Sequence, residues 1–357
     1  MSTQLYAQFD HGSFAIVSRA LTHVLKRAAV DATVYAYGSL SPRYIDIPFQ
    51  VAMNSHADTG IFVGYPRESL GWLTGHEKSI ILTVCESSPV PPEWIYSLNK
   101  TNLVVVPSEF CRDALLASRL QTHVIVCPHG VPASFMNVPP QKERVGRVRL
   151  LHVSEAGSFP WRKGTSQLIQ AFRRIQETFP NVDLYIKSDS LQLDKVLRGG
   201  DRIYPLSTLR HAATIPSFYH AFDAVVQPSR GEGFGLVPLE ARCLGIPVAL
   251  TASTGHLQHI ATDVDTVIPV GPSKRAETQG NAGGSMPTVS VDEVERALMR
   301  LLGNLEECKA KTRAWAASQG PRWTWTRVLT PLVKHIVDFG GISRLYDLDE
   351  EHGVRGF

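Results

Sequence analysis

The sequence predicts an α/β protein made of two doubly wound, Rossmann-like parallel sheets. Short apolar runs typical of buried strands alternate with helical patterns along most of the chain. Connections through helices imply parallel sheets that are covered on both faces. A segment rich in proline and charge, at 132–148, divides this alternation and is predicted to be a linker. A length of 357 residues fits two domains of ordinary size.

The predicted elements follow from these apolar patterns, in chain order. In the first half, strands are expected near 33–37, 60–64, 79–84, 103–106 and 123–127, and helices near 14–29, 91–99 and 108–118. In the second half, strands are expected near 149–153, 183–187, 202–204, 223–227, 247–250 and 267–269, and helices near 164–178, 215–221, 236–244 and 291–302. Four glycines, two prolines and no apolar periodicity predict an exposed loop at 271–290.

Composition limits the class of protein. Hydrophobic residues make up 43% and charged residues 19%, as in soluble globular proteins. No run approaches the roughly 18–20 apolar residues of a membrane span, and the N-terminus lacks the pattern of a signal peptide. Five cysteines without a CxxC pair indicate buried thiols in a reducing compartment, so we predict a cytoplasmic protein. The net charge of +3 does not indicate a nucleic-acid acceptor. A nucleic-acid acceptor stays an open alternative, because a small net charge is compatible with a local basic patch.

The stretch PSRGEGFGLVPLEARCLGIP at 228–247 carries the chemistry. It follows the strand-like run AFDAVVQ and places Glu232 in a glycine-rich loop, with Glu240 on the expected helix beyond it. A strand, glycine loop and helix in this order direct backbone amides and a positive helix end at an anion. Two carboxylates would repel a bare phosphate, so they are expected to bind hydroxyls beside it. A phosphate flanked by hydroxyls is typical of a nucleotide sugar.

This segment resembles the E-x7-E signature of the retaining GT-B glycosyltransferases of family 4. Other segments resemble the same family in the same order and extend the similarity from about 11 to about 330. They are HGSFAIVSRAL at 11–21, VVVPSEFCRDAL at 104–115, VCPHGV at 126–131, RKGTSQLIQAF at 162–172 and FYHAFDAVVQPSRGEGFGLVPLEA at 218–241.

The resemblance implies a GT-B fold in which two domains face each other across a cleft. It implies an acceptor-side domain at 1–140 and a nucleotide-sugar-binding domain at 141–320. A helix at 321–340 would cross back to pack on the first domain, and 341–357 would form a tail. A helix packed on the second domain alone is the alternative.

The resemblance also implies the donor-site residues. Arg162 and Lys163 would hold the diphosphate, and arginine and lysine suit that role chemically. Glu232 would contact the donor sugar, and Glu240 the ribose. The remaining donor-side candidates are Gly12 and Ser13 in the first domain, the loop residues Gly233, Phe234, Gly235 and Leu236, and Tyr204 near the nucleobase. Gly12 and Ser13 could equally form a plain strand-to-helix turn. Gly157 stands where the family often has a further arginine.

The acceptor side is less defined. Glu86, His56 and His129 are candidates to line it, while Glu86 could instead cap a helix and His129 could only shape a turn. The acceptor hydroxyl could belong to a glycan, metabolite, lipid or modified nucleobase.

The expected function is a retaining, hexosyltransferase-like glycosyltransferase that uses a nucleoside-diphosphate sugar, with a UDP-sugar preferred and no metal or other cofactor required. Eight residues of mostly helix rise about 12 Å, which disfavours a glycosidase pair, whose carboxyls stand about 5 Å apart. The alternatives are a nucleotide-sugar-binding protein and a phosphorylase- or epimerase-like enzyme on the same fold. The DVD sequence at 263–265 lies in a late loop, where no metal site is expected.

Overall fold

The computed structural model describes residues 2–9, 12–37, 56–139, 146–154, 161–188, 200–206, 215–275 and 284–339. They divide into two compact units. Of the described residues, unit 1 comprises those up to Pro132, Gly284 and those from Arg322 to Phe339, and unit 2 comprises those within Ala133–Arg275 and Ser285–Pro321. The division falls at the start of the proline-rich stretch predicted to be a linker.

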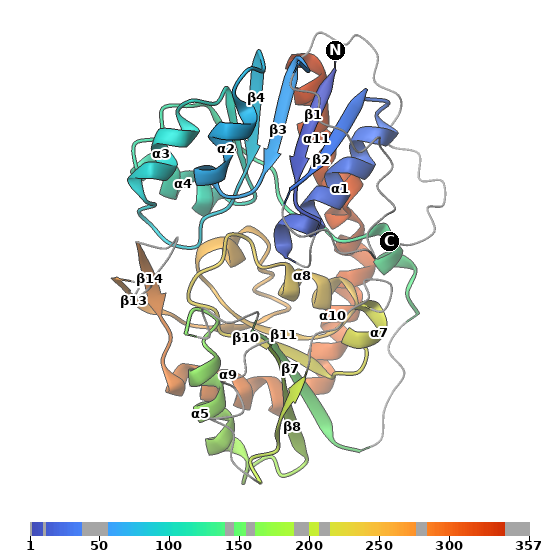
Figure 1. The fold of residues 1–357 in the computed structure, drawn as a ribbon. Helices are drawn as coiled ribbons and strands as arrows, with labels where there is room; N and C mark the ends of the chain where they lie inside the picture. Colours follow the sequence, from blue (N-terminus) through green and yellow to red (C-terminus); the bar gives the residue numbers. More distant parts are fainter. Residues whose placement is uncertain are drawn as a thin grey trace. The chain divides into compact units, whose positions relative to one another are not determined.

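Unit 1 contains a six-stranded parallel sheet with the order β2-β1-β3-β4-β5-β6 (Figure 1). Its strands are β1 (Thr3–Ala7), β2 (Ala32–Ala36), β3 (Thr59–Val63), β4 (Lys78–Leu82), β5 (Leu103–Val106) and β6 (Val124–Val126). The central strands β3 and β5 are buried along their whole length, as expected for a sheet with both faces covered. The strand order reverses between β1 and β3, which is where parallel sheets of this kind hold ligands.

The helices of unit 1 are α1 (Ser13–Arg27), α2 (Pro66–Leu73), α3 (Pro92–Leu98), α4 (Glu109–Ala117) and α11 (Trp325–Phe339). Proline opens α2 and α3, where its missing N–H costs no helix hydrogen bond. Helix α11 packs against α1 and buries Leu332, Val333 and Ile336 (Figure 1). A parallel bridge between Val131 and Thr324 ties the start of this segment to unit 1.

Unit 2 contains a second six-stranded parallel sheet, with the order β12-β11-β10-β7-β8-β9. Its strands are β7 (Val148–Val153), β8 (Val182–Lys187), β9 (Ile203–Leu206), β10 (Ala224–Gln227), β11 (Val248–Thr251) and β12 (Thr266–Ile268). Its α-helices are α5 (Thr165–Ile175), α7 (Ile215–Tyr219), α8 (Leu236–Cys243), α9 (Val291–Gly303) and α10 (Leu305–Gln319). Short 3₁₀ helices are η1 (Ala133–Asn137), η3 (Thr254–Gln258) and η4 (Gly320–Trp323), the last of which spans the division between the units. The order of the sheet reverses between β10 and β7.

The prediction of an exposed loop at 271–290 is wrong at both ends. Strands β13 (Gly271–Arg275) and β14 (Ser285–Thr288) pair as an antiparallel ribbon, and residues 276–283 lie outside the described chain. Strand β13 is exposed throughout, so backbone pairing forms it and no apolar alternation marks it. Met286, which is fully buried, anchors β14.

Besides the β13–β14 ribbon and the short 3₁₀ helices, three elements have no counterpart in the sequence prediction: β1, α2 and α10. Strand β1 lies inside the sheet, but its fully buried Gln4 interrupts the apolar pattern by which a buried strand is recognised in the sequence. The amide of Gln4 donates to Thr33 O at 3.2 Å and accepts from Thr33 Oγ1 at 2.9 Å, so its polar atoms are satisfied by the neighbouring strand. Helix α10 buries only Leu305 and Thr312, which gives it little apolar pattern.

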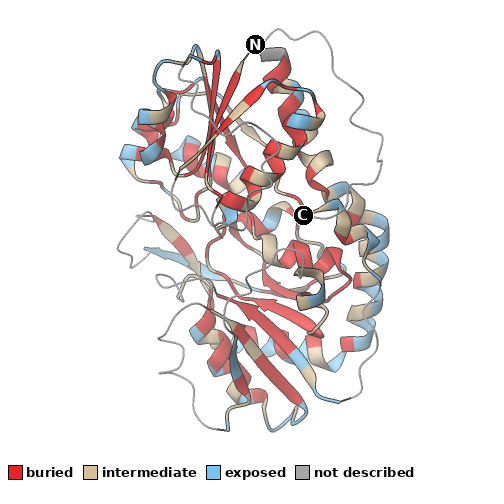
Figure 2. Ribbon diagram, turned by 45° about the vertical axis from the view of Figure 1, so that its right-hand side comes forward, coloured by how far each residue is buried: buried red, intermediate tan, exposed pale blue. Residues whose placement is uncertain are grey.

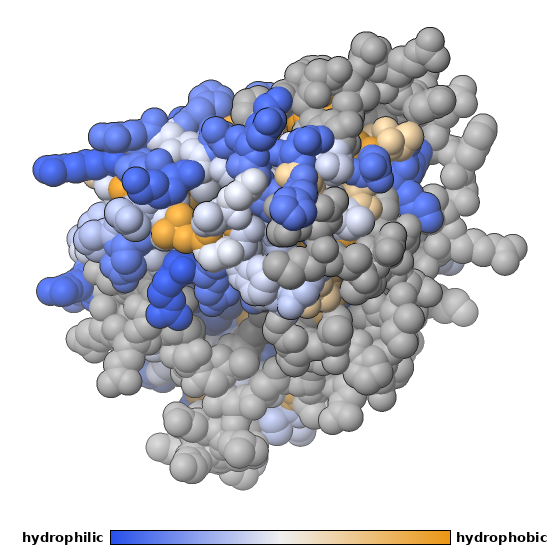
Figure 3. Space-filling model, turned by 45° about the horizontal axis from the view of Figure 1, so that its top comes forward, coloured by the Kyte–Doolittle hydropathy of each residue, from blue (hydrophilic) through white to orange (hydrophobic). Residues whose placement is uncertain are grey.

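Burial follows the sheets in both units. The strands of the two sheets are largely buried, whereas much of α10 is exposed (Figure 2). On the face shown in Figure 3, hydrophilic residues predominate among those coloured and hydrophobic ones form small separate spots. None of the described helices combines the length and the apolar character needed to cross a bilayer.

A buried ion pair holds α8 in unit 2. Arg242 on α8 is fully buried, and its Nε donates to Asp265 Oδ1 at 2.8 Å. Its guanidinium also lies 4.8 Å from the centre of the Trp315 ring on α10. Burial raises the pKa of Asp265, an effect that the charge of Arg242 opposes. The pair therefore links α8, α10 and the segment before β12.

Arg242→Met should destabilise the protein by about 3–5 kcal/mol, because it leaves Asp265 buried without a counter-charge. Denaturant unfolding monitored by circular dichroism measures this change. Arg296→Met removes an exposed arginine paired with Glu293 on α9, and should stay within about 0.5 kcal/mol. Equal effects of the two substitutions would contradict a structural role for the buried pair.

Candidate functional site

The candidate site lies where the strand order of unit 2 reverses, at the carboxyl ends of β7 and β10. At these strand ends, side chains form hydrogen bonds to the backbone of the neighbouring strand. Gln227 accepts from Val153 N and donates to Val153 O, both at 3.1 Å. The Nδ1 of His152 donates to Val226 O at 2.9 Å. These contacts fix the two strand ends from which the functional loops depart.

The loop after β7 docks onto the loop after β10 through its backbone. Gly164 has φ +69°, and a Cβ there would lie 2.1 Å from Pro228 O, so only glycine fits. Arg230 N donates to Arg162 O at 2.7 Å, and Arg162 Nη1 donates to Gly231 O at 2.7 Å. The start of α5 is thereby held against the glycine-rich loop.

Three predicted residues meet in this docked pair of loops. Lys163 Nζ lies 2.7 Å from Glu232 Oε1, and Arg162 Nη1 lies 3.4 Å from Glu232 Oε2. Each of the three side chains is only 9–12% exposed. Burial alone would raise the pKa of Glu232, but Lys163 and Arg162 hold it well below its usual range. Two cations face one carboxylate, so the cluster carries one net positive charge.

The glycine-rich loop leads into α8 with a fixed geometry. Gly235 caps the helix with φ +90°, which favours glycine. Helix η3 supports the loop from behind: Gly255 N donates to Glu232 O at 2.8 Å, and Thr254 Oγ1 accepts from Glu232 N at 3.1 Å. The predicted residues Gly233, Phe234, Gly235 and Leu236 therefore lie together at the positive end of α8.

Glu240 lies on α8 and is nearly buried, with 8% of its surface exposed. Its Oε2 accepts a hydrogen bond from the Tyr219 hydroxyl at 2.7 Å. Tyr219 thus orients the predicted ribose-binding carboxylate. Tyr219 was not among the predicted site residues, because a contact across 21 residues leaves no spacing signal in the sequence.

Tyr204 lies apart from the charged cluster along the sheet, in the edge strand β9. It is 43% exposed and stacks on Tyr185 of β8, with ring centres 5.1 Å apart. The edge strand thus presents an aromatic surface to solvent. A nucleobase contact at Tyr204 stays a prediction, and Gly157 lies outside the described residues.

Unit 1 brings together some of the predicted acceptor-side residues and separates one. Gly12 caps α1 and Ser13 begins it, directly after β1, while Glu86 follows β4 and His129 follows β6. These positions share the carboxyl edge of the parallel sheet. His56 precedes β3 and therefore lies at the opposite, amino edge. Strand polarity thus separates His56 from the other four positions.

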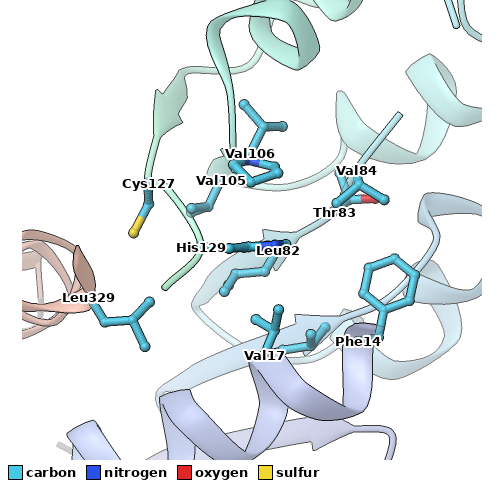
Figure 4. Close-up of a pocket in the computed structure, with 12 residues that line it drawn as sticks. Phe14, Val17, Leu82, Thr83, Val84, Val105, Val106, Cys127, His129 and Leu329 are labelled. Carbon is cyan, nitrogen blue, oxygen red and sulfur yellow. The ribbon is translucent and has the colours of Figure 1, made fainter. Parts of the chain in front are cut away.

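An apolar pocket opens at this carboxyl edge, within unit 1 (Figure 4). Phe14 and Val17 of α1, Leu82 of β4 and Leu329 of α11 contribute apolar walls, and His129 lies among them. Burial lowers the pKa of His129 to about 3, so its ring is neutral at physiological pH. The ring centre lies 5.7 Å from that of Trp325.

Metal-binding groups do not gather in the part of the chain that the structure describes. No set of three or more histidine, cysteine or acidic side chains there is placed to hold an ion. Asp265 of the DVD sequence is committed to Arg242.

Comparisons with known proteins agree with this geometry. Residues 148–280 match the family model described as Glycosyl transferases group 1, so this part of the chain is a domain of that type. Glycogen synthase from Mycobacterium tuberculosis is 26% identical over 223 residues, which cover 59% of this chain and 52% of the relative. The chain thus spans about half the length of this curated relative.

Solved structures establish the fold. Anabaena HepE, in complex with UDP and glucose, superposes with a TM-score of 0.72 at 15% identity, covering 95% of this chain and all of the other. Sucrose-phosphate synthase from Thermosynechococcus elongatus gives a TM-score of 0.68 at 15% identity, covering 96% of this chain and all of the other. The predicted GT-B fold is confirmed.

Glu232→Gln should destabilise unit 2 at pH 7, because Arg162 and Lys163 would then face each other without a carboxylate. A carboxylate whose pKa is depressed on folding contributes stability above its unfolded pKa, and that contribution is lost as the pH falls toward the folded value. The unfolding midpoints of wild type and variant should therefore differ at pH 7, begin to converge near pH 4 and approach each other further as the pH falls. A difference that stays constant down to pH 2 would contradict this charge arrangement.

Proposed function

We propose that the protein is a retaining glycosyltransferase that transfers a sugar from a nucleoside-diphosphate sugar to an acceptor hydroxyl. The observation that carries this proposal is the buried cluster of Arg162, Lys163 and Glu232, where the strand order of a group 1 domain reverses. The cluster supplies fixed cations beside a carboxylate that can accept hydrogen bonds from sugar hydroxyls.

The chemistry of transfer needs this combination. Cleavage of the bond between the anomeric carbon and the phosphate oxygen places growing negative charge on the diphosphate. Arg162 and Lys163, together with the amides at the start of α8, would stabilise that charge. They are held before the ligand arrives, so little reorganisation is needed during the reaction.

The donor we propose is a UDP-sugar. HepE, which shares the fold, is described in complex with UDP-glucose as well as with UDP and glucose. Glu240, oriented by Tyr219, would accept hydrogen bonds from the ribose hydroxyls. Because two protein cations already face the diphosphate, we propose that no metal ion is required.

The acceptor side is proposed to lie in unit 1, at the carboxyl edge that carries Gly12, Ser13, Glu86 and His129. His56 is not part of this proposal, because strand polarity places it at the other edge. Glu86 would orient the acceptor hydroxyl. Attack occurs from the side of the leaving group, and the departing phosphate oxygen accepts the proton of that hydroxyl.

Incubation with UDP-, GDP- and ADP-sugars and pooled acceptors should give a glycosylated product, detected by mass spectrometry. Lys163→Ala should lower turnover about a hundredfold, or about 2.7 kcal/mol, because its charge stabilises the departing diphosphate. Lys311→Ala on α10, which removes an exposed lysine paired with Glu307, is the matched control and should retain full turnover. Turnover of Lys163→Ala within threefold of wild type would reduce the cluster to a structural feature. Binding of nucleotide sugars without turnover would favour a binding protein.

The product should retain the anomeric configuration of the donor, because the charged groups of the site gather on the donor side. NMR of the purified product determines the configuration. EDTA should leave the rate unchanged, and Glu86→Gln should keep measurable activity, since Glu86 orients but does not deprotonate. A β-linked product from an α-linked donor, or a rate abolished by EDTA and restored by Mn²⁺, would overturn the corresponding part of the mechanism.

A further inference from the structure

One buried histidine beside the glycine-rich loop has a ring nitrogen without a hydrogen-bond partner. His256 in η3 is 1% exposed, and its Nδ1 lies 3.1 Å from Thr251 O. A carbonyl oxygen only accepts, so Nδ1 carries the proton and Nε2 of the neutral ring is a bare acceptor. Within the described residues, Nε2 is buried and finds no partner. A buried polar atom left in this way is destabilising, so it calls for a partner.

The free nitrogen is directed at the start of α8. A Cβ on Gly235 would lie 2.7 Å from Nε2 and 2.3 Å from Cδ2 of the same ring. Backbone contacts hold η3 in this place, since Gly255 N donates to Glu232 O and a Cβ on Gly255 would lie 2.3 Å from the carbonyl carbon of Gly233. The ring therefore lies against the loop that leads into the helix N-terminus.

Charged and titratable groups from each neighbouring element act on His256. Glu232 in the loop favours its protonated form, whereas Lys163 before α5 and Arg242 on α8 disfavour it. The ring of His259, which follows η3, lies 6.0 Å away between centres. With burial as the largest influence, the pKa of His256 falls to about 4, so the ring is neutral without a ligand.

The charge of the site is incomplete for a diphosphate. Arg162, Lys163 and Glu232 together give one net positive charge. A nucleoside-diphosphate sugar brings about two negative charges, which rise toward three once the sugar has left. One more positive charge at the start of α8 would balance the bound donor and stabilise the departing nucleotide.

We propose that His256 supplies this charge: it takes up a proton when the diphosphate binds, and Nε2 then donates a hydrogen bond to a phosphate oxygen. This inference rests on the proposed nucleotide-sugar function and assigns to that site a further substrate-binding residue. The proton comes from solvent and returns to it when the nucleotide leaves. Affinity must then fall as the pH rises between the free and bound pKa of His256, by up to about tenfold per pH unit.

Calorimetric titration with UDP at pH 7, in buffers of different ionisation enthalpy, measures the protons taken up. His256→Asn is the informative variant, because its amide can keep the contact with Thr251 O while Nε2 is lost. We expect wild type to take up close to one proton more per UDP than this variant. The variant should bind UDP about tenfold or more weakly at pH 6, with the gap closing toward pH 9. His123→Asn, at an exposed position in unit 1, is the matched control and should behave as wild type.

Nitrogen NMR of the wild-type protein gives a second readout that needs no variant. UDP should shift the Nε2 resonance of His256 from the unprotonated to the protonated range. UDP binding with equal proton uptake in wild type and His256→Asn, or with an unchanged Nε2 resonance, would overturn this inference and leave the proposed function standing. Failure of wild type to bind UDP, GDP and ADP would remove the proposed function, and this inference with it.

Discussion

The ion pair between Glu232 and Lys163 is the interaction on which the candidate site depends. It joins the loop after β10 to the turn before α5, across 69 positions of sequence. Taking these charges out of water is costly, and the pair repays that cost only because backbone contacts hold it in place. Gly164 allows the turn before α5 to approach Pro228 closely. The hydrogen bond from Arg230 N to Arg162 O then holds this turn against the loop after β10. The charge cluster therefore depends on the close backbone packing of the two loops.

The same arrangement bears on the proposed function. A bound diphosphate would face the same two cations, Arg162 and Lys163, that lie against Glu232. The hydroxyls of the attached sugar would then lie near this carboxylate. Thr254 and Gly255 hold the backbone of Glu232 on both sides, so the side chain can change partner while the loop stays in place.

Buried polar groups with fixed partners recur through both units. Gln4 pairs with Thr33 inside the first sheet, Gln227 with the backbone of Val153 at the second switch point, and Arg242 with Asp265 beneath α8. Each of these three groups is satisfied by hydrogen bonds, as most buried polar atoms are. Nε2 of His256 is among the few described buried side-chain atoms without a partner, and it lies beside the glycine-rich loop. Its position next to the proposed anion site is what sets it apart from an ordinary core histidine.

The sequence by itself determined the alternation of strands and helices, the two-sheet α/β class, and the strand–loop–helix unit that carries Glu232 and Glu240. These follow from apolar periodicity and glycine placement, which are local properties of the chain. It did not reveal β1, where a buried glutamine breaks the apolar pattern, or β13, where exposed backbone pairing leaves no pattern. Only the tertiary structure decided the order of the strands in each sheet and the place of His256. It also decided the ion pair of Lys163 with Glu232 and the hydrogen bond of Tyr219 to Glu240. Each of these joins segments that the sheet brings together, and pairing between distant segments leaves no trace in local periodicity.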